Sequence, residues 1–333
     1  MTIKPVPAWL VKQTGTPDVL VKGDIELAEP QTGEVKIRVC AAGFNPIDTK
    51  IRAGLAPILN DAGVLGCDVS GEVIAIGDGV THLAVGDCVY GCAGGVKGNG
   101  GALAAEMVCD ADLLAKAPQS VSLVQAASIP LVAITAFEAL KRLAPQAHEK
   151  LLVMGASGGV GQWAIRLAQE SGIEVFGTAG SNERVEQLKQ QGVYADLHAN
   201  AAELSGSWEQ PGFEKVLDAF GGESLQKALE VAAPYAQVAT INARNNYDLT
   251  QAHAKSLTLH AIFMLLPLLT EKAGTGKGRK TYGEFLAQLS EKIDAGFITV
   301  PVAQEQQMSD VAEIHRTYEA GELSNKVVMI ADF

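Results

Sequence analysis

The sequence contains no apolar run long enough to cross a bilayer as a helix. Its longest apolar segment, Leu257–Leu269, is interrupted by Thr258, His260 and Pro267. Residues 1–10 include two prolines and no continuous apolar core, so we expect no secretory signal. These features predict a soluble, cytoplasmic protein that has no membrane partner.

Basic clusters, metal-ligand pairs and a hydrolytic triad are also lacking. The net charge is −12 and no group of lysines and arginines is positioned to neutralise phosphates, so we expect no nucleic-acid partner. The six histidines are scattered without a convincing Ser/His/Asp set, which argues against nucleophilic hydrolysis. Cys88 and Cys92 resemble half a metal site, but no second close pair and no histidine follows. We therefore predict no metal.

The cysteines that are present do not form a disulfide framework. There are five, an odd number, and all of them lie in the first 110 residues of the 333-residue chain. We interpret them as small core residues. The length predicts two domains, each able to bury a core.

A glycine-rich segment follows a short apolar run at Leu151–Met154. It consists of Gly155, Ala156 and the residues that we assign to cofactor binding, namely Ser157, Gly158, Gly159, Val160 and Gly161. A helical pattern begins at Gln162 and should stop at Gly172. A strand, a tight turn and a helix N-terminus in this order hold a diphosphate, because backbone N–H groups and the helix dipole point at the negative charge. The alternative is an ordinary strand–helix turn, since Ala156 replaces the first glycine of the usual pattern.

The next strand is expected to end near the adenosine ribose of a dinucleotide. NAD enzymes usually carry an acidic residue there, but this chain has Ala179, Gly180, Ser181, Asn182, Glu183 and Arg184. A hydroxyl and a guanidinium attract a 2′-phosphate that a carboxylate would repel. We therefore predict NADPH and assign Gly180, Ser181 and Arg184 to it. Ser181 is equally suited to capping the next helix, and Arg184 to lying on its solvated face.

From Lys150 onward, strands and helices alternate, which predicts a parallel, doubly wound α/β sheet. The predicted strands are Leu151–Met154, Glu174–Thr178, Lys215–Asp218, Gln237–Ile241 and Leu257–Phe263. Ligands bind at the carboxyl ends of such strands. We therefore also assign Asn242 and Phe263 to the cofactor.

The first 125 residues have a different pattern, of short strands separated by Gly/Asp turns. Val35, Ile37 and Val39 alternate with polar neighbours as in a half-buried strand. A β-barrel-like domain is expected here, and the strand Lys326–Ile330 should rejoin it. Between them, Gly274–Thr281 is predicted to be an exposed loop and Tyr282–Ala295 a helix.

Several motifs in sequence order resemble the zinc-free quinone oxidoreductase branch of the medium-chain dehydrogenase/reductase family. They are Ala41–Gly54, Gly66–Val73, Gly86–Val89, Ser128–Pro130, Gly155–Gly161 and Gly177–Ser181. The resemblance implies a GroES-like β-rich catalytic domain, residues 1–125 completed by 268–333, and a Rossmann domain, residues 126–267. It also implies a homodimer paired through the edge strands of the Rossmann sheet.

The same resemblance implies that catalytic zinc is not held. The positions that align with the zinc ligands of related alcohol dehydrogenases are Asn45, Cys67 and roughly Leu131, an unsuitable donor set. Thr135 and Lys326 are expected, by family analogy, near the nicotinamide or its phosphates. Relatives often have an aromatic or histidine residue after the third strand that covers the adenine or phosphate; the candidates here are His198 and Ala199, and His198 suits a loop role as well. A tyrosine that is common near Lys50 in relatives is not found at that place in this sequence, which argues against stacking of a quinone there.

Without a metal, hydride transfer requires an acceptor that can spread charge onto oxygen, such as a quinone or an α,β-unsaturated carbonyl compound (an enone). We assign Asn45 as the hydrogen-bond donor to the acceptor carbonyl. Asp48 either organises the same loop or caps the helical turn that extends as far as Arg52. Two alternatives remain open: a zinc-type alcohol dehydrogenase and a non-catalytic NADPH-binding redox sensor.

Overall fold

The computed structural model describes residues 5–205 and 212–333. The chain divides into two compact units, the first formed by residues 1–131 and 265–333 and the second by residues 132–264. The boundaries expected from the sequence were 125/126 and 267/268. The first boundary falls inside helix α3 (Pro130–Leu143), which begins in the first unit and continues in the second.

The second unit is built on a six-stranded sheet in which every neighbouring pair is parallel. In spatial order the strands are β10 (Tyr194–Leu197), β9 (Val175–Ala179), β8 (Leu151–Met154), β11 (Phe213–Asp218), β12 (Ala232–Thr240) and β13 (Thr258–Ala261). This order confirms the doubly wound Rossmann sheet. The strand list from the sequence omitted β10, which is short, with polar Asp196 and exposed Tyr194 in place of a continuous apolar run.

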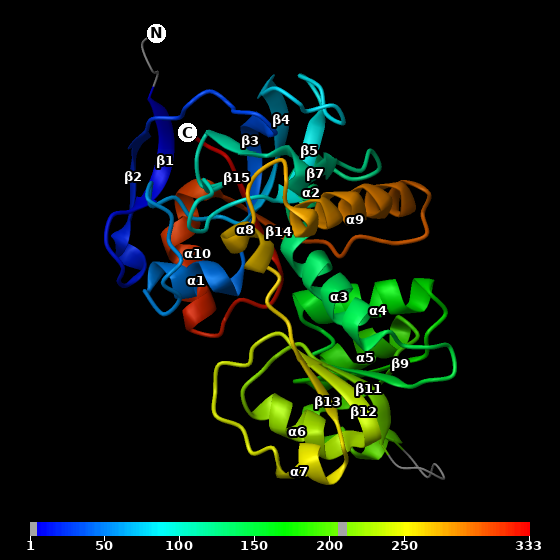
Figure 1. Ribbon diagram of the computed structural model, residues 1–333. Coiled ribbons are helices and arrows are strands. Elements are labelled where there is room, and N and C mark those ends of the chain that lie inside the picture. Colours follow the sequence, from blue (N-terminus) through cyan, green and yellow to red (C-terminus); the bar gives the residue numbers. More distant parts are fainter. Residues whose placement is uncertain (1–4, 206–211) are drawn as a thin grey trace. The chain divides into compact units, whose positions relative to one another are not determined.

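Helices connect these strands (Figure 1), and they are α4 (Gly159–Glu170), α5 (Asn182–Gln190), α6 (Glu223–Val231) and α7 (Thr250–Ala254), with 3₁₀ turns at His198–Asn200 and Glu203–Ser205. Helix α4 buries Ala164 and Ala168 on the apolar stripe that the sequence indicates. It begins at Gly159 rather than Gln162, because Gly158 has the extended backbone of an N-cap residue. The glycines of the turn therefore form the helix N-terminus itself.

The first unit contains a seven-stranded sheet and a separate hairpin. The sheet strands are β3 (Glu34–Gly43), β4 (Asp68–Ile76), β5 (Cys88–Cys92), β6 (Glu106–Asp110), β7 (Leu114–Lys116), β14 (Gln304–Gln307) and β15 (Val327–Ile330), and the hairpin strands are β1 (Val6–Val11) and β2 (Leu20–Ile25). The helices are α1 (Pro46–Arg52), α2 (Leu123–Ala126), α8 (Leu266–Thr270), α9 (Lys277–Asp294) and α10 (Val311–Glu319), with 3₁₀ turns at Pro17–Val19, Ala111–Leu113 and Met308–Asp310. Val35, Ile37 and Val39 are buried, as their alternation predicts.

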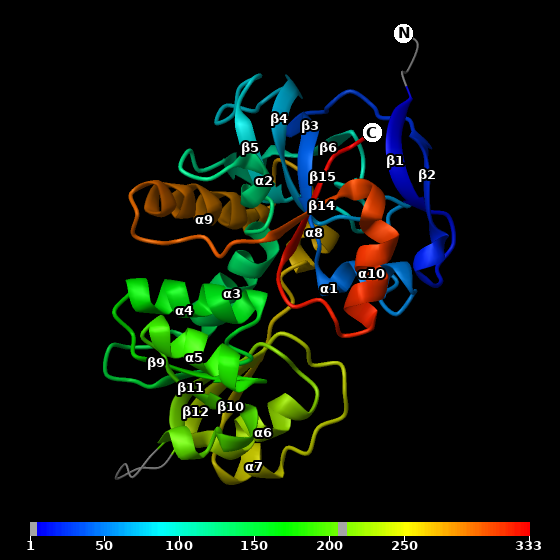
Figure 2. The ribbon, with the colours of Figure 1, turned by 180° about the vertical axis from the view of Figure 1, so that it is seen from behind.

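The end of the chain returns to the first unit, as the sequence predicts. Strand β15 pairs antiparallel with β3, Val328 opposite Gly43 and Ile330 opposite Ala41. Figure 2 shows this red strand beside the blue β3. The pairing brings residues near the C-terminus next to the turn between β3 and α1.

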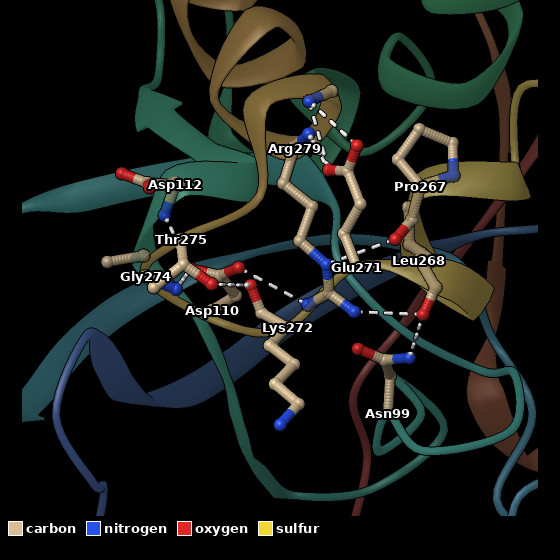
Figure 3. A network of polar contacts seen from close by, with 12 residues as sticks. Asn99, Asp110, Asp112, Pro267, Leu268, Glu271, Lys272, Gly274, Thr275 and Arg279 are labelled. Carbon is tan, nitrogen blue, oxygen red and sulfur yellow. Dashed lines mark hydrogen bonds and ion pairs between the residues drawn. The ribbon is translucent and has the colours of Figure 1, made fainter.

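One prediction for the C-terminal segment is wrong: Gly274–Thr281 is not an exposed loop. Helix α9 begins at Lys277, and Arg279 is 4% exposed. The guanidinium donates to Asp110 Oδ2 at 3.2 Å and to the Leu268 carbonyl at 2.8 Å, while the Glu271 carboxylate accepts the backbone N–H groups of Gly278 and Arg279 (Figure 3). The glycines and lysines obscured this helix start in the sequence, because one of the groups that stabilise it, Asp110, lies 169 positions from Arg279.

Candidate functional site

The glycine turn, Gly155–Gly161, lies at the carboxyl end of β8 and contains the N-terminus of α4. Gly155 has φ +75°, and its carbonyl accepts the N–H of Gly158 at 3.0 Å. Ser157 is half-buried, whereas Gly158 and Gly159 are exposed. The first turn of a helix leaves N–H groups without intrahelical partners, and here the first of them belongs to the exposed Gly159. The turn therefore has the donors and the dipole that an anion requires.

Close packing requires glycine at one position of this turn and leaves little room for a side chain at a second. A Cβ on Gly161 would lie 2.4 Å from the Gly155 carbonyl oxygen and 2.7 Å from Ala156 Cα, so the helix could not approach the strand. A Cβ on Gly159 would lie 3.0 Å from Val132 Cγ1. Because side chains are excluded and backbone is exposed, the turn fits a dinucleotide diphosphate, as the sequence predicts.

The end of β9 has no carboxylate at the position expected for NAD enzymes. Ala179 is buried, Gly180 and Ser181 are exposed, and α5 begins at Asn182. The backbone N–H of Arg184 donates to the Ser181 hydroxyl at 3.4 Å, which confirms the capping role for this serine. Contact of Ser181 or Arg184 with a phosphate stays a prediction.

His198 follows β10 and lies beside Gly180. Its Nδ1 is 2.8 Å from Thr178 Oγ1, and a Cβ on Gly180 would lie 3.8 Å from its Nε2. Burial and the positive charge of Lys227 lower the pKa of His198 below its ordinary value, which favours the neutral ring. The imidazole is thus fixed by Thr178 at the edge of the sheet where β9 and β10 end.

Strands β11 and β12 end next to each other, and Asp218 organises the turn that follows β11. Its Oδ2 accepts the Thr240 hydroxyl at 2.7 Å, and its Oδ1 accepts the N–H of Gly221 at 2.9 Å. Asn242 lies against Gly221, whose missing Cβ would be 2.6 Å from Asn242 Cβ. Phe263, after β13, is 44% exposed. The structure therefore brings Asn242 and Phe263 to the same edge as the glycine turn.

In the first unit, Asn45, Asp68 and Lys326 form a group that we call the Asp68 cluster, in which Asn45 and Asp68 are fully buried and Lys326 is half-buried. Lys326 Nζ donates to Asn45 Oδ1 at 2.7 Å, to the Phe44 carbonyl at 2.8 Å and to Asp68 Oδ2 at 3.2 Å. Asn45 Nδ2 donates to Asp68 Oδ2 at 2.8 Å and to the Gly43 carbonyl at 3.2 Å. Both amide hydrogens of the fully buried Asn45 are thus already engaged.

Asp48 lies next to this cluster and caps helix α1. Its Oδ2 accepts the backbone N–H of Asn45 at 2.8 Å, which confirms the capping interpretation, and its Oδ1 is 3.9 Å from Cys67 Sγ. Burial raises the pKa of Asp48 to about 7 and also raises the pKa of Asp68. One ammonium therefore faces two buried carboxyl groups, and part of the Asp48 population keeps its proton near neutral pH.

The positions that align with zinc ligands do not form a zinc site. Asn45 is bonded within the Asp68 cluster, and Leu131 has no donor atom in its side chain. A hydrogen bond with Cys92, together with burial, raises the pKa of Cys67 well above its usual value. Within residues 5–205 and 212–333, no three His, Cys, Asp or Glu side chains gather as metal ligands. One thiol beside an amide and an aliphatic side chain does not fit catalytic zinc.

Sequence reasoning overlooked Asp68. It lies inside the family motif Gly66–Val73 and was not assigned a role of its own, although the structure makes it the centre of the cluster. Its Oδ1 accepts the N–H of Leu131 at 2.8 Å, in the first turn of α3. An aspartate at the start of the apolar β4, directly after Cys67, was the signal that could have identified it.

Thr135, which lies on helix α3, is 5% exposed.

Two family profiles match the chain. "Alcohol dehydrogenase GroES-like domain" matches residues 31–119, and "Zinc-binding dehydrogenase" matches residues 159–273, so together they cover most of both units. The chain belongs to the medium-chain dehydrogenase/reductase family. It shares with that family the GroES-like unit and the Rossmann sheet described above, which confirms the resemblance seen in the sequence.

Curated relatives of this chain include polyketide synthases. The chain is 38% identical over 229 residues to polyketide synthase GfsB of Streptomyces halstedii, matching 67% of this chain and 4% of that protein. It is 27% identical over 330 residues to a mycocerosic acid synthase-like polyketide synthase of Mycolicibacterium smegmatis, matching 96% and 15%. This chain therefore spans only a small part of the length of these relatives.

Solved structures of similar chains cover almost all of it. The quinone oxidoreductase from Coxiella burnetii has 25% identity and a TM-score of 0.81, with 99% of this chain and 100% of that chain covered. Mycobacterial Rv1454c complexed with NADPH has 28% identity and a TM-score of 0.83, with coverages of 98% and 99%. CurK enoyl reductase has 25% identity and a TM-score of 0.84, with coverages of 98% and 99%.

No helix in the described part of the chain is both long and apolar enough to cross a membrane.

Proposed function

We propose that this medium-chain reductase uses NADPH to reduce a quinone or an α,β-unsaturated carbonyl compound without a metal. The observation that carries the proposal is the chemistry at Asn45, Cys67 and Leu131, where an amide, a high-pKa buried thiol and an aliphatic side chain replace zinc ligands. Without a Lewis acid, conjugated acceptors are favoured, because their oxygen takes up the negative charge that arrives with hydride.

The proposed cofactor is supported by the edge of the Rossmann sheet. The glycine turn would hold the diphosphate, while Gly180, Ser181 and Arg184 would receive the adenosine 2′-phosphate at a strand end that carries no acidic residue. The NADPH complex of a 28% identical relative is consistent with a nicotinamide cofactor. When bound, reduced nicotinamide would supply the hydride.

On the acceptor side, the chain would contribute positioning and polarity. We retain Asn45 as the donor to the acceptor carbonyl, with a condition that follows from its contacts. Its amide must exchange the longer of its two donated bonds, 3.2 Å to the Gly43 carbonyl, for the acceptor oxygen. Lys326 would keep the amide oriented through Asn45 Oδ1, and Asp48 would keep the helix start in place.

Enoyl thioesters form a second acceptor class, favoured by one specific observation. The curated relatives are polyketide synthases, and one structural neighbour is an enoyl reductase. An enoyl thioester is also an α,β-unsaturated carbonyl compound, so the same hydride chemistry applies. Quinones, enones and enoyl thioesters therefore belong in one test.

The experiment follows the loss of reduced-nicotinamide absorbance with each acceptor class, using NADPH and NADH in parallel. We expect turnover with at least one conjugated acceptor and a higher kcat/KM with NADPH. Equal kcat/KM values would contradict the assignment of residues 180–184. Tight NADPH binding without turnover on any acceptor would favour the redox sensor instead, and stoichiometric zinc by metal analysis would favour an alcohol dehydrogenase.

We also propose a homodimer that forms through the edge of the Rossmann sheet. Strand β13 ends the strand order and carries Leu259, which is 40% exposed. Sedimentation equilibrium should give twice the chain mass, and Leu259→Lys should shift it toward the monomer. A wild-type monomer would contradict this proposal. A cytoplasmic location stays a prediction from the sequence.

A further inference from the structure

Asp68 fixes the start of helix α3. Its Oδ1 accepts the N–H of Leu131, the second residue of the helix, at 2.8 Å. The carboxylate is itself fully buried, and its other oxygen accepts from Asn45 and Lys326. A carboxylate at a helix N-terminus is stabilising, since it accepts a hydrogen bond from a first-turn N–H and complements the helix dipole. The first turn of α3 is thus bound to a group that cannot shift easily.

The next residue along the helix supports the glycine turn. Val132 is 6% exposed, and its Cγ1 lies 3.0 Å from the place where a Cβ on Gly159 would be. Val132 and Gly159 both belong to the second unit. Gly159 is the first residue of α4, so the position of Val132 limits where this helix start can lie.

We propose that Asp68 is a positioning residue for the dinucleotide, acting through Leu131 and Val132 on the glycine turn. Leu131 and Val132 are consecutive residues of α3, and they connect the Asp68 carboxylate to the glycine turn. A helix transmits a small displacement with little bending. Displacements well below 1 Å at a diphosphate site are sufficient to weaken charge-assisted hydrogen bonds. The inference rests on the proposed cofactor function.

The test measures the Kd of NADPH by fluorescence titration in a double-mutant cycle of Asp68→Ala and Val132→Ala. We expect about a fivefold to tenfold weaker Kd for Asp68→Ala and about threefold for Val132→Ala. The double variant should resemble Asp68→Ala alone, because the two substitutions interrupt one path. Multiplied effects, or an Asp68→Ala Kd within about twofold of wild type, would overturn the inference.

Asp110→Ala is the matched control. Asp110 is also a buried carboxylate of the first unit; it accepts the N–H groups of Asp112 and Gly274 and pairs with Arg279 (Figure 3), and none of these three residues belongs to α3. The Asp110→Ala variant should be less stable than the wild type, but its Kd for NADPH should stay within about twofold of the wild-type value. An equal loss of affinity in Asp110→Ala would mean general loosening of the fold and would contradict a path through α3.

Two further outcomes separate this inference from the function beneath it. If the wild type binds no NADPH, the proposed function fails and the inference falls with it. If the wild type binds NADPH and the cycle is additive, only the inference fails. Should Asp68→Ala not yield folded protein, Asp68→Ser takes its place in the cycle, with a smaller expected loss and the same criterion of non-additivity.

Discussion

The glycine turn of the second unit and the Asp68 cluster of the first unit are built by opposite means. The glycine turn excludes side chains so that backbone N–H groups are exposed, and its residues are consecutive in sequence. The Asp68 cluster is made of side chains that satisfy one another, and they come from three separate segments. Lys326 meets Asn45 across 281 positions, and Asn45 meets Asp68 across 23.

This difference determines what each region tolerates. At the glycine turn, we expect residue identity to matter where a Cβ has no room, and the side chain of Ser157 to matter little. In the Asp68 cluster, each polar atom depends on the next, so removing one partner leaves another buried and unpaired. Substitutions in each region separate these two behaviours, and the largest effect is expected in the cluster.

Lys326→Met should cost the most stability. It leaves the buried Asp68 carboxylate without its ammonium, and breaking a buried ion pair costs about 3–5 kcal/mol. Urea denaturation measures the loss. The control is Lys189→Met, which removes an exposed pair with Glu186 at 3.8 Å and should change the unfolding free energy by less than about 0.5 kcal/mol. Equal losses in both variants would refute the importance of the cluster.

Gly161→Ala should abolish tight NADPH binding and cost about 2–3 kcal/mol of stability, because its Cβ would lie 2.4 Å from a backbone oxygen. Thermal denaturation and NADPH titration measure the two effects. In Gly100→Ala the closest atom, the Val108 carbonyl oxygen, would be 3.6 Å away, so this control should behave as wild type. Unchanged NADPH affinity in Gly161→Ala would argue against the glycine turn as the binding site.

Asp48→Asn should alter how stability depends on pH. The Asp48 pKa is about 7 in the folded state and near 3.8 in the unfolded state, so the folded state binds more protons between these values. This aspartate therefore makes stability fall as pH rises from about 4 to about 7, by up to about 1.4 kcal/mol per pH unit. Asparagine removes that slope. Parallel wild-type and variant curves of unfolding free energy against pH would contradict the raised pKa.

Arg184→Leu should weaken NADPH binding about tenfold, or about 1.4 kcal/mol, and leave NADH binding unchanged, because only the 2′-phosphate loses a partner. Titration with both cofactors measures the ratio of the two Kd values. Lys189→Leu, near the end of the same helix α5, is the control for net charge. If both cofactors lose affinity equally, Arg184 supports the fold rather than cofactor choice.

Ser157→Ala should have the smallest effect. The turn acts through its backbone, so the NADPH Kd should stay within about twofold of wild type. A much larger loss by titration would show that the side chain binds the diphosphate, and the contrast between the two regions would narrow.

Local signals were sufficient to predict the glycine turn and five of the six strands of the Rossmann sheet, all but β10. Apolar runs, clustered glycines and the stop at Gly172 act over a few residues, so the sequence displays them directly. The helix start at Lys277 was missed for the opposite reason. Glu271 and Asp110 stabilise it, and the second of these is 169 positions away from Arg279.

The Asp68 cluster could be predicted only in part. Asn45 and Lys326 were both identified by family resemblance, yet nothing in the sequence indicated that they bond to each other or to Asp68. Antiparallel pairing of β15 with β3 creates that contact, and such pairing depends on the whole sheet rather than on neighbouring residues. The lowered hydrogen-bonding capacity of Asn45 for a substrate follows from the same contacts.

The most direct test of the account is turnover by protein stripped of metal. After treatment with a strong chelator, and with the chelator still present, NADPH should be oxidised by a quinone or an α,β-unsaturated carbonyl acceptor at the rate of untreated protein. Loss of that rate on chelation, restored by zinc, would contradict metal-free hydride transfer.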